Sequence, residues 1–72
     1  MIAITVLVDG QVVKTASAKS RWELPDVIAR ETVEFEHDPN LRLEREEKVR
    51  NAANELTEVR VHYQRTATPV SR

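Results

Sequence analysis

The sequence predicts a small α+β domain, a two-layer sandwich of order β-β-α-α-β in which a three-stranded sheet carries two helices on one face. Three observations predict this class. A β-branched apolar run opens the chain, two amphipathic helical patterns fill its middle, and an alternating segment closes it. A chain of 72 residues is too short for two hydrophobic cores. We therefore expect one domain over residues 1–65, followed by a flexible tail at 66–72.

The first two strands are predicted to form a hairpin. Residues 2–8, IAITVLV, are apolar and mostly β-branched, which favours a strand buried on both faces at the centre of the sheet. Asp9 and Gly10 supply the turn, because glycine tolerates the positive φ that a tight hairpin needs. Residues 11–19 are more polar and predict a strand at the edge of the sheet.

The first helix is predicted from one apolar face with three- and four-residue spacing. The face consists of Leu24, Val27, Ile28, Thr32 and Phe35. Two start signals compete, because Ser20 and Glu23 have the form of a capping box whereas Pro25 suits the first helical position. The end is also open, since residues 33–37 can instead form a short strand.

The second helix is predicted after Asp38, which indicates a helix cap before Pro39 or else a turn capped by Asn40. A narrow apolar stripe follows, with Leu41 or Leu43 leading into it. Its members are Val49, Ala52, Ala53 and Leu56. Two pairs of opposite charges at i,i+4 spacing support a helix. They are Glu44 with Lys48 and Glu46 with Arg50.

The last strand is predicted from the clean alternation of TEVRVHYQ, residues 57–64. Its inward positions are Val59, Val61 and Tyr63, and its outward positions are Arg60, His62 and Gln64. We place this strand parallel to the first one, which then lies between it and the second strand.

Residues 34–38, EFEHD, hold the one cluster that resembles a metal or acid/base site. Its candidates are Glu34, Glu36, His37 and Asp38. The spacing of known zinc motifs such as H-E-x-x-H is absent, and the other histidine, His62, belongs to a separate strand. We interpret the cluster as a helix end followed by a cap, and we expect no metal and no cofactor.

Catalytic motifs are absent as well. The chain has no cysteine and no G-x-S-x-G elbow, and its one glycine is used by the predicted turn. We therefore expect a protein that is not an enzyme.

Acidic residues are concentrated in the predicted helical layer, since residues 23–58 contain eleven of the twelve Asp and Glu residues. We expect this acidic face to dock on the basic surface of a partner protein, because opposite charges steer and orient association. The expected contact residues are Glu31, Glu34, Glu44, Glu46, Glu47 and Glu55. Trp22 is interpreted as a lid on the core, with an interface anchor as the alternative.

Two alternatives use the open face of the sheet. The first is a homodimer through an apolar patch of Leu7 and either Val12 or Val13; a two-residue turn places Val13 opposite Val6, and a bulged turn selects Val12 instead. The second is weak nucleic-acid binding by basic residues on the same face. They are Lys14, Arg60, His62 and Arg65. The sequence pI of about 6.1 and the inward Tyr63 count against it.

In size, composition and predicted architecture, the chain resembles the small inhibitors that phages and mobile elements encode, such as anti-CRISPR and anti-restriction proteins. This resemblance implies a non-catalytic protein that occludes the nucleic-acid-binding groove of a processing complex. The first apolar run ends at Asp9, too early for a signal core or a membrane span. With the lack of cysteine, this predicts a cytoplasmic protein.

Overall fold

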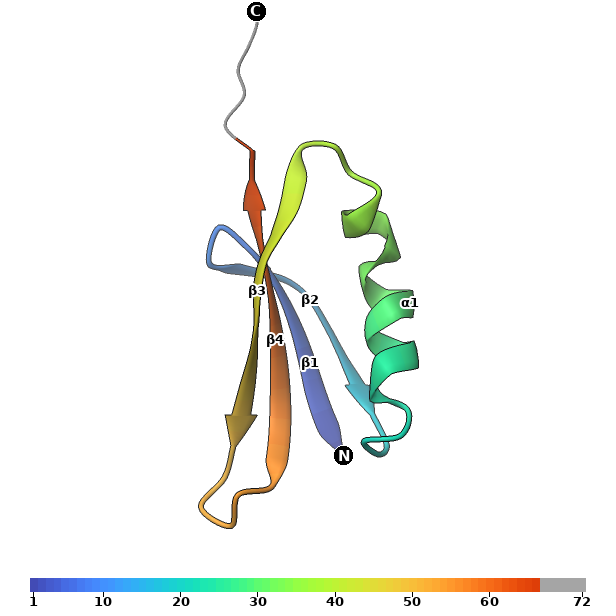
Figure 1. Ribbon diagram of the computed structural model, residues 1–72, viewed down its shortest axis with the longest axis vertical. Helices are drawn as coiled ribbons and strands as arrows, with labels where there is room; N and C mark the ends of the chain where they lie inside the picture. The colour runs from blue at the N-terminus through green and yellow to red at the C-terminus, as the bar shows by residue number, and fades with distance from the viewer. Residues whose placement is uncertain (67–72) are drawn as a thin grey trace, which may run out of the picture.

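The computed structural model describes residues 1–66 and shows a four-stranded mixed sheet with one helix, in the order β-β-α-β-β (Figure 1). The elements are β1 (Ile2–Val8), β2 (Gln11–Ala18), α1 (Leu24–Glu36), β3 (Leu41–Arg50) and β4 (Leu56–Arg65). The strand order is β2-β1-β4-β3, with β1 and β4 parallel and each outer strand antiparallel to its neighbour. The α+β class is confirmed, whereas the predicted three strands and two helices are wrong.

The two central strands, β1 and β4, form the core; the central place of β1 is as predicted, whereas β4 was expected at an edge of the sheet. Side chains of β1 and β4 that face α1 are almost completely buried, with exposed fractions of 0–2% for Ile4, Val6, Val59, Val61 and Tyr63. The predicted parallel pairing of the first and last strands is confirmed over Ala3–Val8 and Glu58–Tyr63. The prediction that the second strand lies at an edge is also confirmed.

The predicted second helix is instead the edge strand β3. Residues 41–50 are good helix formers, but β4 needs a partner for its free side, and β3 pairs with it along its whole length. The helical stripe is cut by a turn at residues 51–55. There the Asn51 Oδ1 atom accepts the backbone N–H groups of Ala53 and Glu55 at 2.9 and 3.0 Å. Asn54 has a φ of 64°, a conformation that asparagine tolerates better than most residues.

The first hairpin confirms the turn at Asp9 and Gly10 but has neither expected register. Val6 pairs with Lys14 and Leu7 pairs with Val12, so that Val13 is an extra residue in a bulge. Both valines are exposed, at 58% and 50%. The bulge changes the face to which the rest of β2 points, and it turns Lys14 toward α1.

The apolar face of α1 is confirmed, since Leu24, Val27 and Thr32 are buried and the other two predicted residues pack against the core. Pro25 lies at the start of the helix, and Glu23 occupies the cap without a side-chain hydrogen bond to the first turn; its carboxylate instead accepts the N–H of Lys19 at 3.2 Å. The capping box is therefore wrong, and so is the alternative strand at 33–37, because the helix continues to Glu36.

The end of the described chain is joined to the turn before β3. The N–H of Thr66 donates to the carbonyl of Asn40 at 2.9 Å. Residues 67–72 of the predicted tail lie outside the described residues. Within residues 1–66, no helix is long and apolar enough to cross a membrane.

Candidate protein-binding groove

The six glutamates expected on one acidic helical face do not share a surface. Two lie on α1, three on β3 and one in the turn between β3 and β4. They are Glu31 and Glu34, then Glu44, Glu46 and Glu47, and finally Glu55. The expected helical face is wrong for the last four, because β3 alternates its side chains between the two faces of the sheet.

The two glutamates on α1 are paired with Lys14 of β2. The Lys14 Nζ atom lies 3.2 Å from a carboxylate oxygen of Glu31 and 3.0 Å from one of Glu34. The hydrogen bond to Glu34, followed by that to Glu31, raises the pKa of Lys14, and Lys14 in turn lowers the pKa of Glu31. Lys14 therefore faces the helix, and its predicted place on the open sheet face is wrong.

The other face of the sheet carries a row of contacts between basic residues or histidine and carboxylates. His62 Nε2 lies 3.1 Å from Glu47, and Arg60 lies 3.3 Å from Glu58. The Thr5 hydroxyl also donates to Glu58 at 2.6 Å, and this hydrogen bond lowers the pKa of Glu58. The basic residues expected to bind phosphates on this face are thus already close to carboxylates, including Arg65, which lies 3.1 Å from Asp9.

The apolar patch predicted on that face is exposed only in part, since Val12, which pairs with Leu7, is 58% exposed but Leu7 is not. Leu7 is only 8% exposed, and the histidine that pairs with it in β4, His62, is 9% exposed. The prediction of an exposed Leu7 is wrong. Thr5, Arg60 and Glu47 occupy the same face, so its accessible side chains are mostly polar.

Trp22 is exposed to 86%, so its interpretation as a lid on the core is wrong. It lies in the turn of residues 21–23 that leads into α1. A tryptophan in water leaves a large apolar surface without contacts, which is typical of a residue that binds a partner.

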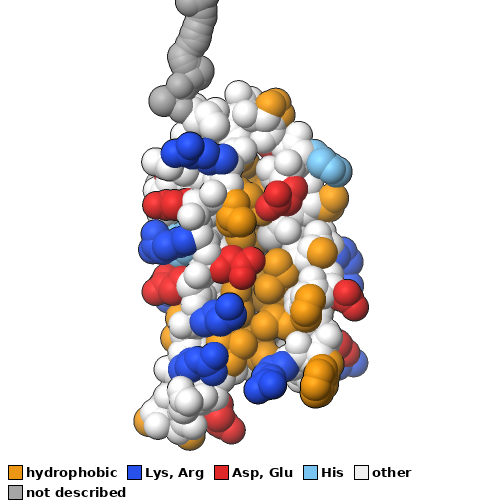
Figure 2. All heavy atoms as spheres, in the orientation of Figure 1, with side chains coloured by type: hydrophobic (Ala, Val, Ile, Leu, Met, Phe, Trp, Pro, Cys, Tyr) orange, Lys and Arg blue, Asp and Glu red, His pale blue; other side chains and the backbone are white. Residues whose placement is uncertain are grey.

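A groove lies between α1 and β3, on the helix side of the sheet. Figure 2 shows its apolar strip between the charged side chains over β3 and the helix. The middle part is a hollow of about 380 Å³. It is lined by Leu24, Pro25, Ile28 and Ala29 of α1 and by Glu46 and Lys48 of β3.

The groove stays open because β3 is polar on both faces. Glu46 and Lys48 stand opposite the buried Val61 and Val59 of β4, so they share the face that α1 covers. Charged side chains at these positions keep their ends in water and do not seal the core against the helix. Part of the apolar surface of α1 is left exposed as a result.

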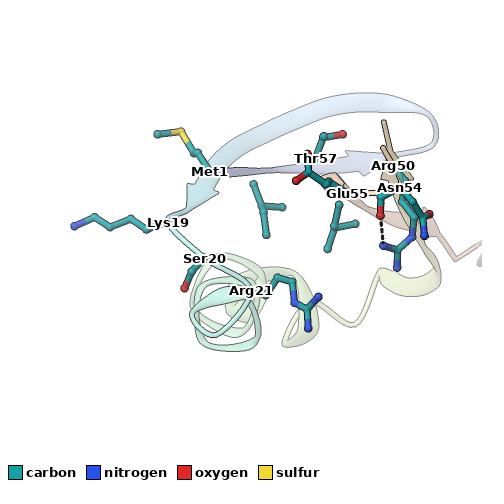
Figure 3. A pocket seen from close by; sticks show the side chains of 10 residues that line it. Met1, Lys19, Ser20, Arg21, Arg50, Asn54, Glu55 and Thr57 are labelled. Atoms are coloured by element: carbon teal, nitrogen blue, oxygen red, sulfur yellow. Dashed lines mark hydrogen bonds between the residues drawn. The ribbon is translucent and has the colours of Figure 1, made fainter. Parts of the chain in front are cut away.

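The end of the groove next to the first turn of α1 is basic. Arg21 from the turn before α1 and Arg50 from the end of β3 line the same hollow, together with Leu56. Figure 3 shows the two arginines on opposite sides of this hollow and Lys19 extending away from it. Arg50 donates to the carbonyl of Asn54 at 3.4 Å. Within residues 1–66, neither arginine nor Lys48 is part of an ion pair, whereas most other basic residues near the sheet are.

The EFEHD cluster is divided between separate contacts. Glu36 accepts a hydrogen bond of 2.5 Å from the Tyr63 hydroxyl, and Asp38 accepts the N–H of Asn40 at 2.8 Å. Among the described residues, no three histidine or acidic side chains are grouped so that they could hold a metal ion.

No protein-family model, curated protein or solved structure matches this chain significantly. The groove offers an apolar floor with cations at its rim and at one end, which suits binding of an anionic apolar segment.

Sequence reasoning missed the groove because the predicted second helix would have covered it. The signals that could have revealed it are Asn51 and Asn54, which favour a turn, and the alternation of Leu41 and Leu43 with polar residues.

Proposed function

We propose that this protein is a non-catalytic protein-binding module whose groove between α1 and β3 holds an acidic, partly apolar segment of a partner protein. One observation carries the proposal. The groove combines exposed apolar side chains with three basic residues, Arg21, Lys48 and Arg50, that have no ion-pair partner among residues 1–66.

The apolar floor supports binding of side chains rather than of a free ion. Pro25 and Ala29 are exposed, and Ile28 is partly exposed although it also packs against the core. Covering apolar surface contributes about 25 cal/mol per Å², so a few aliphatic side chains in the groove would supply a substantial part of a micromolar affinity.

The charges favour an acidic partner. Four basic groups, Lys19, Arg21, Lys48 and Arg50, line the groove and its end against two acidic ones, Glu46 and Glu55. Glu55 already accepts a hydrogen bond from Asn51 at 3.2 Å. Carboxylates of the partner would steer its approach and fix its orientation, and this contribution would weaken as salt is added. The proposal thus moves the contact from the glutamates expected from the sequence to the groove.

Trp22 supports the same surface. It does not line the hollow itself, but its neighbours Arg21 and Leu24 do, and its 86% exposed ring leaves an apolar surface next to the groove in the chain. Tryptophan beside a partly apolar groove is a common anchor of protein interfaces.

Selection from a peptide library tests the proposal. The immobilised protein is expected to enrich peptides that carry Asp or Glu next to aliphatic side chains. Binding of an enriched peptide should fall about tenfold in Arg21→Glu, because an attraction becomes a repulsion, and also in Ala29→Glu, which places a carboxylate on the floor. Arg30→Glu is the matched control, since Arg30 lies on the same helix outside the groove.

Two results would contradict the proposal. One is a selection without preference for acidic peptides. The other is equal binding of the enriched peptide by Arg21→Glu, Ala29→Glu and the Arg30→Glu control.

A further inference from the structure

We infer that β3 pairs antiparallel with β3 of a second copy of this chain, about a two-fold axis at Glu47. The two sheets then form one continuous sheet of eight strands. This interface uses the free edge of β3, so it goes beyond the proposed function and does not depend on it. Its charge pairs use Lys48, which also lines the groove, so that in the dimer Arg21 and Arg50 are the groove cations without an ion-pair partner among residues 1–66.

The edge of β3 is long and free. The strand spans ten residues, lies at the end of the sheet order and is bonded on one side only. Such an edge presents unpaired backbone N–H and C=O groups that bind another extended strand. Charged side chains on an edge usually prevent this pairing, so their pattern decides whether a second copy fits.

The pattern of charges around Glu47 is complementary to itself. In an antiparallel pair centred there, Glu46 stands opposite Lys48 of the second copy, and Lys48 stands opposite the second copy's Glu46. Glu44 and Arg50 of the second copy also carry opposite charges, but a register shift between Leu43 and Arg45 places Glu44 in a bulge, where it lies 3.5 Å from Arg45. The complementarity is therefore carried by the two pairs of Glu46 with Lys48. Directly opposite side chains in an antiparallel pair are close enough for these charges to attract.

The residues that meet in this pairing are free to do so. Within residues 1–66, Glu46 and Lys48 form no ion pair, and both lie on the helix side of the sheet. The single like-charged contact, between the two Glu47 residues, lies on the other face, where each Glu47 already has His62 and Arg45 beside it.

Neighbouring registers are less favourable. A shift of the axis by half a residue is excluded, because it would set Glu46 opposite Glu47, and these two side chains point to opposite faces of the sheet. An axis at Glu46 places Arg45 opposite Glu47 and Glu44 opposite Lys48, which are opposite charges. Within one chain, however, Arg45 already lies 3.9 Å from Glu47 and 3.5 Å from Glu44. That axis also places Arg42 opposite Arg50.

The two-fold axis of such a pair is perpendicular to the sheet, so both copies of α1 lie on the same face. The two grooves then run next to each other and stay open. A partner with two acidic segments would bind both at once, with an avidity that a single groove cannot provide.

Variants that reverse the charge of one residue of the pair test this inference, with the dimer dissociation constant measured by sedimentation equilibrium. Glu46→Lys and Lys48→Glu should each raise this dissociation constant about tenfold or more, because both symmetry-related contacts become repulsive. The double variant E46K/K48E should restore it to within about threefold of the original value. Circular dichroism and the thermal midpoint show that each variant is folded.

Single cysteines test the register, since the chain has none of its own. Glu47→Cys should oxidise to a disulfide-linked dimer, because directly opposite Cα atoms are about 4.5–5.5 Å apart. Glu46→Cys should not, since its two Cα atoms would be about 8 Å apart. Asp26→Cys on α1 is the control for random collisions.

The inference is overturned if the protein is monomeric at millimolar concentration, if the double variant does not recover the dimer, or if the Glu47→Cys variant cross-links no faster than the Asp26→Cys variant. None of these variants changes Arg21 or Ala29. A failure here is therefore distinct from a failure of the groove, and peptide binding by Arg21→Glu and Ala29→Glu still decides the proposed function.

Discussion

Tyr63 shows how one residue joins the sheet to the helix. Its ring is 2% exposed and stacks on Phe35 at a centroid distance of 5.5 Å, and its hydroxyl donates to Glu36 at 2.5 Å. Burial of the phenol, followed by its hydrogen bond to Glu36, raises the pKa of Tyr63 to about 12. The last turn of α1 is thereby held to β4.

Replacing Tyr63 with phenylalanine should therefore lower stability in a pH-dependent way. Below pH 10 the free energy of unfolding should be about 1–2 kcal/mol lower in Tyr63→Phe, because the hydrogen bond to Glu36 is lost. A folded-state pKa above the unfolded one contributes stability that is lost as pH rises through about 12. The difference between the two proteins should therefore disappear between pH 10 and 12.

Urea unfolding at a series of pH values measures this difference. Lysine titration affects both proteins alike and cancels in the comparison. A difference that stays constant from pH 9 to 12 would contradict the assigned role of the Tyr63 hydroxyl.

At the scale of elements, the turn between β3 and β4 distinguishes the observed pair of strands from the second helix that the sequence predicts. Asn51→Ala should lower the free energy of unfolding by about 1 kcal/mol, because two backbone N–H groups lose their acceptor. Asn54→Gly should raise it by about 0.5 kcal/mol, since glycine adopts positive φ without strain. In a helix both signs would be opposite, because alanine is the best helix former and glycine a poor one.

Thermal unfolding of the two variants shows whether each one is more or less stable than the original protein. An increase in stability for Asn51→Ala together with a decrease for Asn54→Gly would favour the helix that the sequence predicts for this segment.

The elements that could be predicted from the sequence are those with strong local patterns. The run of residues 2–8, the turn at Asp9 and Gly10, the apolar face of α1 and the alternation of β4 each combine propensity with periodicity. Residues 41–50 could not be assigned in this way, because their charges suit both a helix and an exposed edge strand. Only the need of β4 for a neighbour decides between the two, and that is a tertiary effect.

The candidate site was less predictable than the fold. Leu24 and Ile28 of its floor were identified, but as part of the buried face of the helix, whereas Ala29 was not identified. The rim residues Lys48 and Arg50 were assigned to helical charge pairs. The exposure of Trp22 depends on the path of residues 21–23, for which the sequence carries no periodic signal. A register bulge of one residue was enough to move Lys14 from one face of the sheet to the other.

At the scale of the whole molecule, the net charge does not reveal the local charge of the groove. The chain has a formal charge of −1, which predicts neither an acidic nor a basic partner. In the folded protein, many carboxylates lie beside basic groups across the outer face and the edge of β2. The basic groups that remain unpaired within residues 1–66 include Arg21, Lys48 and Arg50 of the groove, so the local field there differs in sign from the total.

The groove is the central claim, and mapping a bound peptide by amide chemical shifts tests it most directly. An acidic apolar peptide from the library selection is titrated into the isotope-labelled protein. We expect the largest changes at residues 24–29 of α1, at Lys48 and Arg50, and at the indole N–H of Trp22. Changes concentrated on Thr5, Arg60 and His62 would place the peptide on the opposite face of the sheet and would contradict the account.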